Sequence, residues 1–208
     1  NHMGETIRVG RRGSLNGRLI VQGIQGHSAY PERADNPIPH MVKLLGRLNS
    51  EKFDSGTDEF PATHLALTSV DVGNTAANVI PGQIEAKFNM RFNNLWTHDT
   101  LEQHLRRILS EVYPHYNLDI HSNAPSFLTK DTNWRSLVAN AIQKISGKIP
   151  VADTGGGTSD ARFIAQYCPV VEYGLLNESI HKIDEHATVQ DIENLTCTYH
   201  EILKSYFI

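Results

Sequence analysis

The sequence predicts an α+β protein in which a ferredoxin-like split βαβ unit is followed by part of a larger α/β layer. Apolar and polar residues alternate strictly over residues 83–92, as in a strand with one buried face. Apolar residues recur at helical spacing over residues 36–49 and 98–113, between segments with strand character. After Pro125 this order ends, and two further helical patterns frame a glycine-rich turn.

The composition excludes several classes of protein. With 39% hydrophobic and 20% charged residues among 208, the chain has a globular rather than a disordered composition. The 19 basic and 23 acidic residues give a net charge of −4, which offers nucleic acid no electrostatic footprint. No apolar run approaches the roughly 18–20 residues that span a bilayer, so we expect no membrane partner.

The cysteines and the first residues also inform the interpretation. Cys168 and Cys197 are too few for a disulfide framework, and their spacing fits no zinc knuckle. We expect them to be small hydrophobic core residues of a protein in the reducing cytoplasm. Residues 1–4 are interpreted as a tag remnant and linker and excluded from functional reasoning.

The first unit is expected to follow the order β-α-β-β-α-β. Asn36 followed by Pro37 predicts the start of the first helix, and Thr97 or Asp99 predicts that of the second. This order is the split βαβ unit, a two-layer sandwich of about 110 residues. The expected strands cover residues 15–24, 63–72, 83–92 and 117–122.

The segment after Pro125 is expected to be an incomplete layer. It has helical patterns around residues 137–145 and 189–203, and a short buried strand is expected at residues 170–174. About 80 residues of this kind bury too little surface to be stable alone. We therefore expect its remaining strands to lie outside this chain.

Adjacent arginines form the first candidate site. Gly10-Arg11-Arg12-Gly13-Ser14 places two guanidinium groups between glycines, which suits bidentate recognition of carboxylates. A solvated basic turn is the alternative.

A histidine on a turn forms the second candidate site. His27 lies in Gly26-His27-Ser28-Ala29-Tyr30-Pro31, directly after the first expected strand. Such a histidine can donate or accept a proton near neutral pH. A structural or merely exposed histidine is the alternative.

A glycine-rich turn over residues 153–160 forms the third candidate site. Three successive glycines let the backbone approach a ligand and present N–H groups to an anion, with Thr158 or Ser159 capping the next helix. No Lys-Ser or Lys-Thr follows, so this is not a P-loop. A flexible turn is the alternative.

His181 is the fourth candidate, as a metal ligand with acidic neighbours Glu178, Asp184 and Glu185. Zinc requires three or four ligands, and no other segment offers clear companions. From the pattern alone, a metal-binding role for His181 and a role without metal both remain open.

Taken together, these motifs resemble the succinyl-diaminopimelate desuccinylases, a branch of the two-zinc aminoacylase and carboxypeptidase family. The resemblance covers residues 5–208 in order. It rests on Gly-Arg-Arg-Gly-Ser, on Gly-Ile-Gln-Gly-His-Ser-Ala-Tyr-Pro with Ala-Asp-Asn-Pro, and on Asn-Val-Ile-Pro, Gly-Gly-Thr-Ser-Asp and Asn-Glu-Ser-Ile-His-Lys.

The resemblance implies a domain organisation. Residues 13–125 would be a lid and dimerisation domain, through which a homodimer forms. Residues 5–12 and 126–208 would be the C-terminal part of an α/β zinc-exopeptidase-like catalytic domain. The parent enzyme would hold two zinc or cobalt ions, whose other ligands lie in an upstream half. Only the ligand matching His181 would be in this chain, so we expect the isolated chain to lack metal and activity.

The resemblance also implies a reaction and roles for residues. The substrate would be N-succinyl-L,L-2,6-diaminopimelate, a dicarboxylate amide hydrolysed to succinate and diaminopimelate for lysine and cell-wall synthesis. His27 would stabilise the oxyanion from the opposite subunit, and Tyr30 and Asn78 would also reach across. The residues expected to bind substrate carboxylates in cis are Arg11, Ser14, Arg91, Gly157, Thr158 and Asn177.

Three other functions stay open on the sequence. The chain could serve only as a dimerisation module, with sheet edges or the helices of residues 36–49 and 98–113 in contact. It could be a metal-free carboxylate-binding domain built on the arginines and the glycine turn. It could also belong to a related N-acyl-amino-acid deacylase such as acetylornithine deacetylase.

Overall fold

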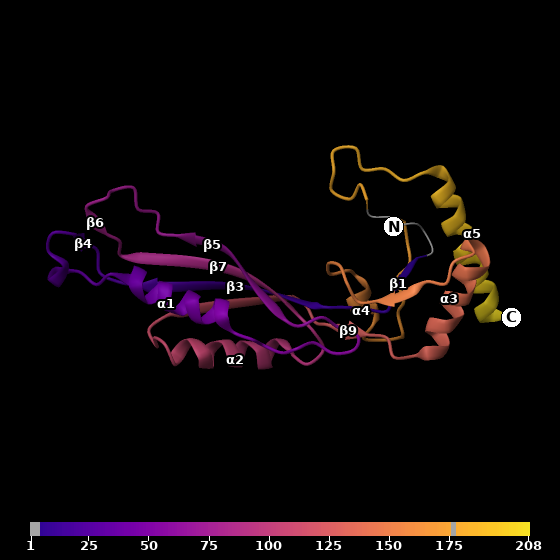
Figure 1. The fold of residues 1–208 in the computed structure, drawn as a ribbon, viewed down its shortest axis with the longest axis horizontal. Helices are drawn as coiled ribbons and strands as arrows, with labels where there is room; N and C mark the ends of the chain where they lie inside the picture. Colours follow the sequence, from indigo (N-terminus) through magenta and orange to yellow (C-terminus); the bar gives the residue numbers. More distant parts are fainter. Residues whose placement is uncertain (1–4, 176–177) are drawn as a thin grey trace. The chain divides into compact units, whose positions relative to one another are not determined.

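The computed structural model describes residues 5–175 and 178–208, which divide into two compact units. The sandwich unit comprises Arg12–Ser126, and the terminal unit comprises residues 1–11 and 127–208. Figure 1 labels helices and strands of both units. Residues 1–4, interpreted as a tag remnant, lie outside the described residues.

The sandwich unit has the predicted order of strands and helices, which is thereby confirmed. Its four strands form an antiparallel sheet in the order β5-β7-β3-β8, which places the first and third strands of the unit at the centre. This arrangement is that of a split βαβ unit. The elements are β3 (Gly13–Gln22), α1 (Pro37–Ser50), β5 (His64–Asp71), β7 (Gln83–Phe92), α2 (His98–Ser110) and β8 (Asn117–Ala124).

One face of this sheet is buried against α1 and α2. In β7 every second residue from Ile84 to Phe92 is buried, as the alternation of the sequence predicts. Met41 and Leu44 of α1 and Leu105 of α2 complete the same core. The opposite face of the central strands carries polar side chains, so the unit has one apolar and one polar sheet face.

Glycine in β3 makes room for an aromatic ring across the strand pair. Gly17 lies opposite Phe88, and a Cβ atom at Gly17 would overlap the Phe88 ring. Gly13 has the same relation to Phe92. Glycine weakens a strand through its backbone entropy, and here the close approach of the rings explains its presence.

Both helices of the sandwich unit begin at capped residues. The Asn36 side chain accepts a hydrogen bond from the Ile38 backbone N–H at 3.1 Å, with proline at the first helical position. Of the two candidates for the second cap, the structure selects Thr97, which forms a reciprocal capping box with Thr100.

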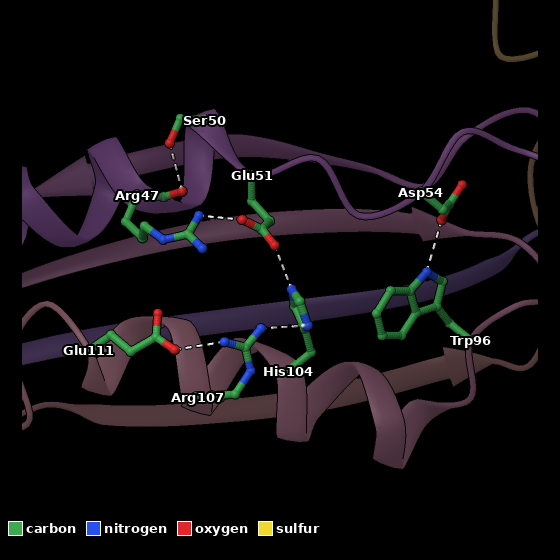
Figure 2. A network of polar contacts seen from close by, with 8 residues as sticks. All are labelled: Arg47, Ser50, Glu51, Asp54, Trp96, His104, Arg107 and Glu111. Carbon is green, nitrogen blue, oxygen red and sulfur yellow. Dashed lines mark hydrogen bonds and ion pairs between the residues drawn. The ribbon is translucent and has the colours of Figure 1, made fainter.

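A chain of charged groups joins the C-terminal end of α1 to the middle and C-terminal end of α2 (Figure 2). Glu51 forms an ion pair with Arg47, and its other oxygen lies 2.7 Å from Nε2 of His104. On the far side of the imidazole, Arg107 lies 3.3 Å from Nδ1 and pairs with Glu111. The two helices are thereby linked by polar contacts as well as by their shared core.

A short ribbon at one end of the sheet was not predicted. β4 (Gly26–His27) pairs with β6 (Val79–Ile80), and the 3-10 helix η1 (Pro31–Arg33) follows β4. Neither β4 nor β6 is among the expected strands. Two residues with Pro81 directly behind them carry too little periodicity to reveal a strand.

The terminal unit holds two small sheets and three helices among its described residues. Parallel β1 and β10 form one sheet, and antiparallel β2 and β9 form the other. Ile7, Val9, Val138 and Ile142 contribute to its core. The elements are β1 (Thr6–Arg8), β2 (Gly10–Arg11), β9 (Phe127–Leu128), α3 (Thr132–Ser146), β10 (Val151–Asp153), α4 (Ala161–Ile164) and α5 (Val189–Phe207).

Two expectations for the terminal unit are wrong. Residues 170–174 form no strand, because only Glu172 makes an isolated bridge, to Arg8, and the residues around it are half-buried or exposed. Cys168 and Cys197 are exposed rather than in a core. Since the core of this unit is small, it leaves both cysteines uncovered. Across the described residues, no helix combines the length and apolarity needed to cross a membrane.

Candidate functional site

A row of polar residues crosses three neighbouring strands of the sandwich unit. Arg91 of β7 pairs with Ser14 of β3 on one side and with His64 of β5 on the other. Directly paired residues of an antiparallel sheet point to the same face, with Cβ atoms about 4.5–5.5 Å apart. Arg12 lies directly before β3, close enough for its charge to act on both Arg91 and His64. We name Arg12, Ser14, His64 and Arg91 the basic row.

The positive charges of the basic row are not balanced by ion pairs with acidic side chains of the described residues. Among the described residues, neither Arg12 nor Arg91 has an ion-pair partner, and the Nε of Arg12 is buried without an acceptor. Burial, and then the charge of Arg91, lower the pKa of Arg12. Partial burial, and then Arg12 and Arg91, lower the pKa of the His64 imidazole. A carboxylate placed here would supply the missing acceptor and relieve the repulsion.

The second group of predicted residues lies on the β4–β6 ribbon. His27 and Tyr30 have ring centroids 5.9 Å apart, and the Ser28 N–H donates to the carbonyl oxygen of Asn78 at 3.0 Å. The three predicted residues, His27, Tyr30 and Asn78, are all exposed. The guanidinium of Arg33 lies 5.1 Å from the centre of the Tyr30 ring, which holds that side chain beside the turn.

The turn sets which nitrogen of His27 is available. The backbone N–H of Ala29 donates to Nδ1 of His27 at 3.0 Å. A neutral imidazole whose Nδ1 accepts a hydrogen bond carries its proton on Nε2. His27 therefore presents an N–H donor to a ligand, as stabilisation of an oxyanion requires.

Arg11 is bound within the terminal unit. Its Nε donates to Glu172 at 2.6 Å, and one terminal nitrogen donates to the carbonyl oxygens of Gly155 and Gly157 at 3.1 and 3.3 Å. The glycine turn thus directs carbonyl groups at Arg11. The contact with Glu172 was not predicted from the sequence. Gly156, with φ of 86°, could not carry a side chain without meeting Arg11.

The same turn is tied to β1 through Asp153. Asp153 pairs with Arg8 and accepts the Gly155 N–H at 2.6 Å. Burial alone would raise the pKa of Asp153, but these contacts more than offset it and the pKa is lowered. The predicted capping by Thr158 or Ser159 is wrong, because α4 begins at Asp160 without a side-chain cap. With one turn, α4 has little to gain from a cap.

His181 is exposed on a loop of the terminal unit and adopts a rare backbone conformation. Its φ of 61° lies in the left-handed region, and its N–H donates to Glu185 at 3.2 Å. Such strain costs of order 1 kcal/mol and concentrates at functional sites. The residue lines a surface depression of about 800 Å³ with Asp184 and His186.

The described residues do not fit a zinc centre by themselves. Within residues 5–175 and 178–208, no three His, Cys, Asp or Glu side chains are grouped so that they could hold one ion. Zinc in proteins has at least three protein ligands, so His181 would need partners from elsewhere. Asn177, the last predicted substrate-binding residue, lies outside the described residues.

The structure separates the predicted residues of the sandwich unit into two places. Ser14 and Arg91 lie at one end of the β3–β7 pair, and His27 follows the other end. From Ser14 to Gln22 the strand advances eight residues, roughly 26 Å at about 3.3 Å per residue. One copy therefore cannot bring both groups to a single small ligand.

Sequence reasoning missed two residues near the candidate sites. Arg12 was part of the first candidate motif, although no substrate contact was assigned to it. His64 could be paired with Arg91 only once the register of β5 was known. Glu172 reaches Arg11 across 161 positions of sequence, which no local pattern reveals.

Comparison with known families and proteins places these residues in context. Residues 9–117 match the family of the peptidase dimerisation domain. The chain is 49% identical over 209 residues to the succinyl-diaminopimelate desuccinylase of Rhodopseudomonas palustris (strain BisB18), covering 99% of this chain and 53% of that protein. It is 48% identical over 210 residues to the enzyme of the same name from Methylocella silvestris, covering 54% of it. The chain spans about half the length of these relatives.

Solved structures agree at the level of the fold. The aminopeptidase PepT of Bacillus cereus superposes with a TM-score of 0.80 at 20% identity, over 99% of this chain and 54% of that one. An M20 family metallo-carboxypeptidase from Sulfolobus solfataricus, Sso-CP2, gives 0.79 at 15% identity, over 97% and 60%. At these identities the likeness concerns the fold alone.

Proposed function

Because the chain belongs to the peptidase dimerisation domain family, we propose that it is the dimerisation and carboxylate-binding part of a metal-dependent succinyl-diaminopimelate desuccinylase. The observation that carries this proposal is the sequence identity of 48–49% to such enzymes over 99% of the chain. The reaction would be hydrolysis of N-succinyl-L,L-2,6-diaminopimelate to succinate and diaminopimelate, in the cytoplasm.

In this proposal two groups of cations recognise the carboxylates of the substrate. The basic row offers Arg12 and Arg91 to one carboxylate, with the buried Ser14, 3% exposed, paired to Arg91. Arg11, together with Gly157, Thr158 and Asn177, would bind a second. Glu172 positions Arg11 by holding its Nε. A dicarboxylate amide accounts for two sites of the same chemistry in one chain.

His27 would act on the substrate of a partner subunit. Its Nε2–H is free of the contact that occupies Nδ1, and Tyr30 and Asn78 lie beside it. The distance along β3 argues against a role in the same copy as Arg91. One donor to a developing oxyanion accelerates other enzymes by roughly 10²–10³-fold.

The zinc or cobalt ions of the active enzyme would take most of their ligands from a part of the enzyme that corresponds to the half of the relatives to which this chain does not align. His181 is the one ligand proposed here, and its strained backbone supports that assignment. A bound metal would supply Lewis-acid activation of water and of the amide.

Homodimerisation is proposed through the β5 side of the sandwich unit. β5 is an edge strand exposed along most of its length, including Leu67 and Val70. Val42 of the neighbouring α1 is 61% exposed. At the other edge, Arg106 of α2 already donates to the Leu118 carbonyl oxygen of β8. An exposed edge of this kind favours pairing with a second copy.

The proposal is tested by exchange. The aligned half of the Rhodopseudomonas palustris enzyme is replaced by this chain, and hydrolysis of N-succinyl-diaminopimelate is measured with zinc. We expect turnover by the exchanged enzyme, none by the 208-residue chain alone, and a loss of roughly 10²–10³-fold in kcat for His27→Ala. An exchanged enzyme that folds and binds zinc but prefers N-acetylornithine would identify a related deacylase instead.

The exposed β5 edge favours a second candidate function, that of a dimerisation module without catalysis. Sedimentation equilibrium of the chain at micromolar concentration tests the contact, with Val70→Lys as the disrupting variant. A chain that dimerises while the exchanged enzyme stays inactive would support the module alone. A strict monomer would contradict the contact for both candidates.

A further inference from the structure

We propose that His64 is the third cation of the basic row and that binding of a dicarboxylate at Arg12 and Arg91 is coupled to uptake of one proton by its imidazole. This inference rests on the proposed function, because it assumes that a carboxylate binds at the row. It adds a residue and a pH dependence that the resemblance to desuccinylases does not include.

The register of the sheet places His64 next to Arg91, where it could contact a carboxylate bound at the basic row. It is paired directly with Arg91 across β5 and β7, on the face that Ser14 shares. Partial burial, and then the charges of both guanidinium groups, lower its pKa. The ring is exposed, so a ligand and a proton can both reach it.

Other charged groups near His64 are already engaged. The loop before β5 contributes Glu51, Lys52 and Asp54 to a depression of about 340 Å³ that His64 also lines. Glu51 is paired with Arg47 and with His104. Lys52 adds positive charge, which would further disfavour a protonated imidazole.

Asp54 is likewise occupied, since it accepts from Trp96 and Asn93 at 2.8 Å and from the backbone of Gly56 and Thr63. Neither acidic group is therefore available to balance the basic row. The charge that would let His64 take a proton has to come with the ligand.

The coupling follows from these charges. Without ligand, partial burial and then the two guanidinium groups lower the pKa of His64 below its ordinary value of about 6.5, which favours the neutral imidazole. A dicarboxylate dianion bound at Arg12 and Arg91 reverses the electrostatic potential at His64. One of its carboxylate oxygens can then accept a hydrogen bond from the protonated imidazole. The pKa rises on binding and a proton moves from solvent to the imidazole. Affinity then increases as pH falls, by at most about tenfold per pH unit.

The test uses calorimetric titration of the whole 208-residue chain with succinate, in buffers of different ionisation enthalpy. Wild type is expected to take up as much as one proton, with affinity falling from pH 6 to pH 8. His64→Gln is expected to bind without proton uptake and without that pH dependence. His121→Gln, an exposed histidine on β8 of the same sheet, is the matched control and should behave as wild type.

A second measurement needs no ligand. NMR titration of His64 in Arg91→Gln should show its pKa raised towards the ordinary value, since a lowering charge has been removed. An unchanged pKa in that variant would overturn the inference.

The outcomes separate this inference from the proposed function. Succinate binding that Arg91→Gln abolishes but His64→Gln leaves unchanged, with equal proton uptake, would sink the role of His64 and keep the carboxylate site. No binding of succinate by wild type would sink both. Equal binding of butyrate and succinate would overturn the coupling to a dianion.

Discussion

At the scale of single residues, Gly17 shows how one absent side chain permits a packing arrangement. The Phe88 ring occupies the space above Gly17, between two central strands of the sheet. We predict that Gly17→Ala destabilises the chain by about 1–3 kcal/mol, because the added methyl group overpacks a dense core. Urea unfolding measures the change.

The matched test is the double variant Gly17→Ala with Phe88→Leu. Leucine leaves the space that alanine needs, so the double variant should be more stable than the sum of the two single changes predicts. Additive changes would mean that the ring does not set the need for glycine.

At the scale of elements, the charged link between α1 and α2 depends on Glu51 (Figure 2). Burial alone would raise the pKa of Glu51, but hydrogen bonds from Arg47 and His104 lower it overall. We predict that Glu51→Gln destabilises the chain by about 1–3 kcal/mol at pH 7, since bonds to a charged group are lost. Urea unfolding at several pH values measures it.

The pH dependence has a defined sign. A carboxyl whose pKa is depressed in the folded state stabilises above its unfolded pKa of about 4.3, and the effect is lost as pH falls through the folded value. The difference between Glu51→Gln and wild type should therefore shrink in acid. Glu111→Gln, in a half-exposed pair, is the control and should cost at most about 1 kcal/mol. A Glu51→Gln effect independent of pH would contradict the charged link.

The sequence predicted those helices and strands whose hydrophobic patterns extend over many residues. β7 alternates over ten residues and α1 has both a cap and an apolar stripe, so their existence followed from periodicity. The β4–β6 ribbon and the bridge at Glu172 depend on pairing between distant segments, which leaves no local signal. For the same reason the motif suggested Arg12 and Ser14, whereas His64 required the register of β5.

At the scale of the whole molecule, the two units differ in the size of their cores. Among the described residues, sixteen hydrophobic side chains are buried in the cluster of the sandwich unit, against six in that of the terminal unit. We predict that the terminal unit opens at lower denaturant concentration, because less apolar surface is buried there. Amide hydrogen exchange should show slow exchange in β3 and β7 and faster exchange in β1 and β10.

The isolated segment of residues 12–126 provides the control for that prediction. If the sandwich unit is a cooperative unit of its own, its unfolding midpoint should match the later transition of the full chain. A single transition shared by all amides would contradict two independent stabilities.

The length of β3 has a genetic consequence. In an active dimer built as proposed, each site would combine the arginine end of one copy with the His27 end of the other. A subunit damaged only at Arg91 and a subunit damaged only at His27 would then complement each other. Their mixed dimer would keep one site with both ends intact and one site with neither, whereas each defective protein alone would have none intact.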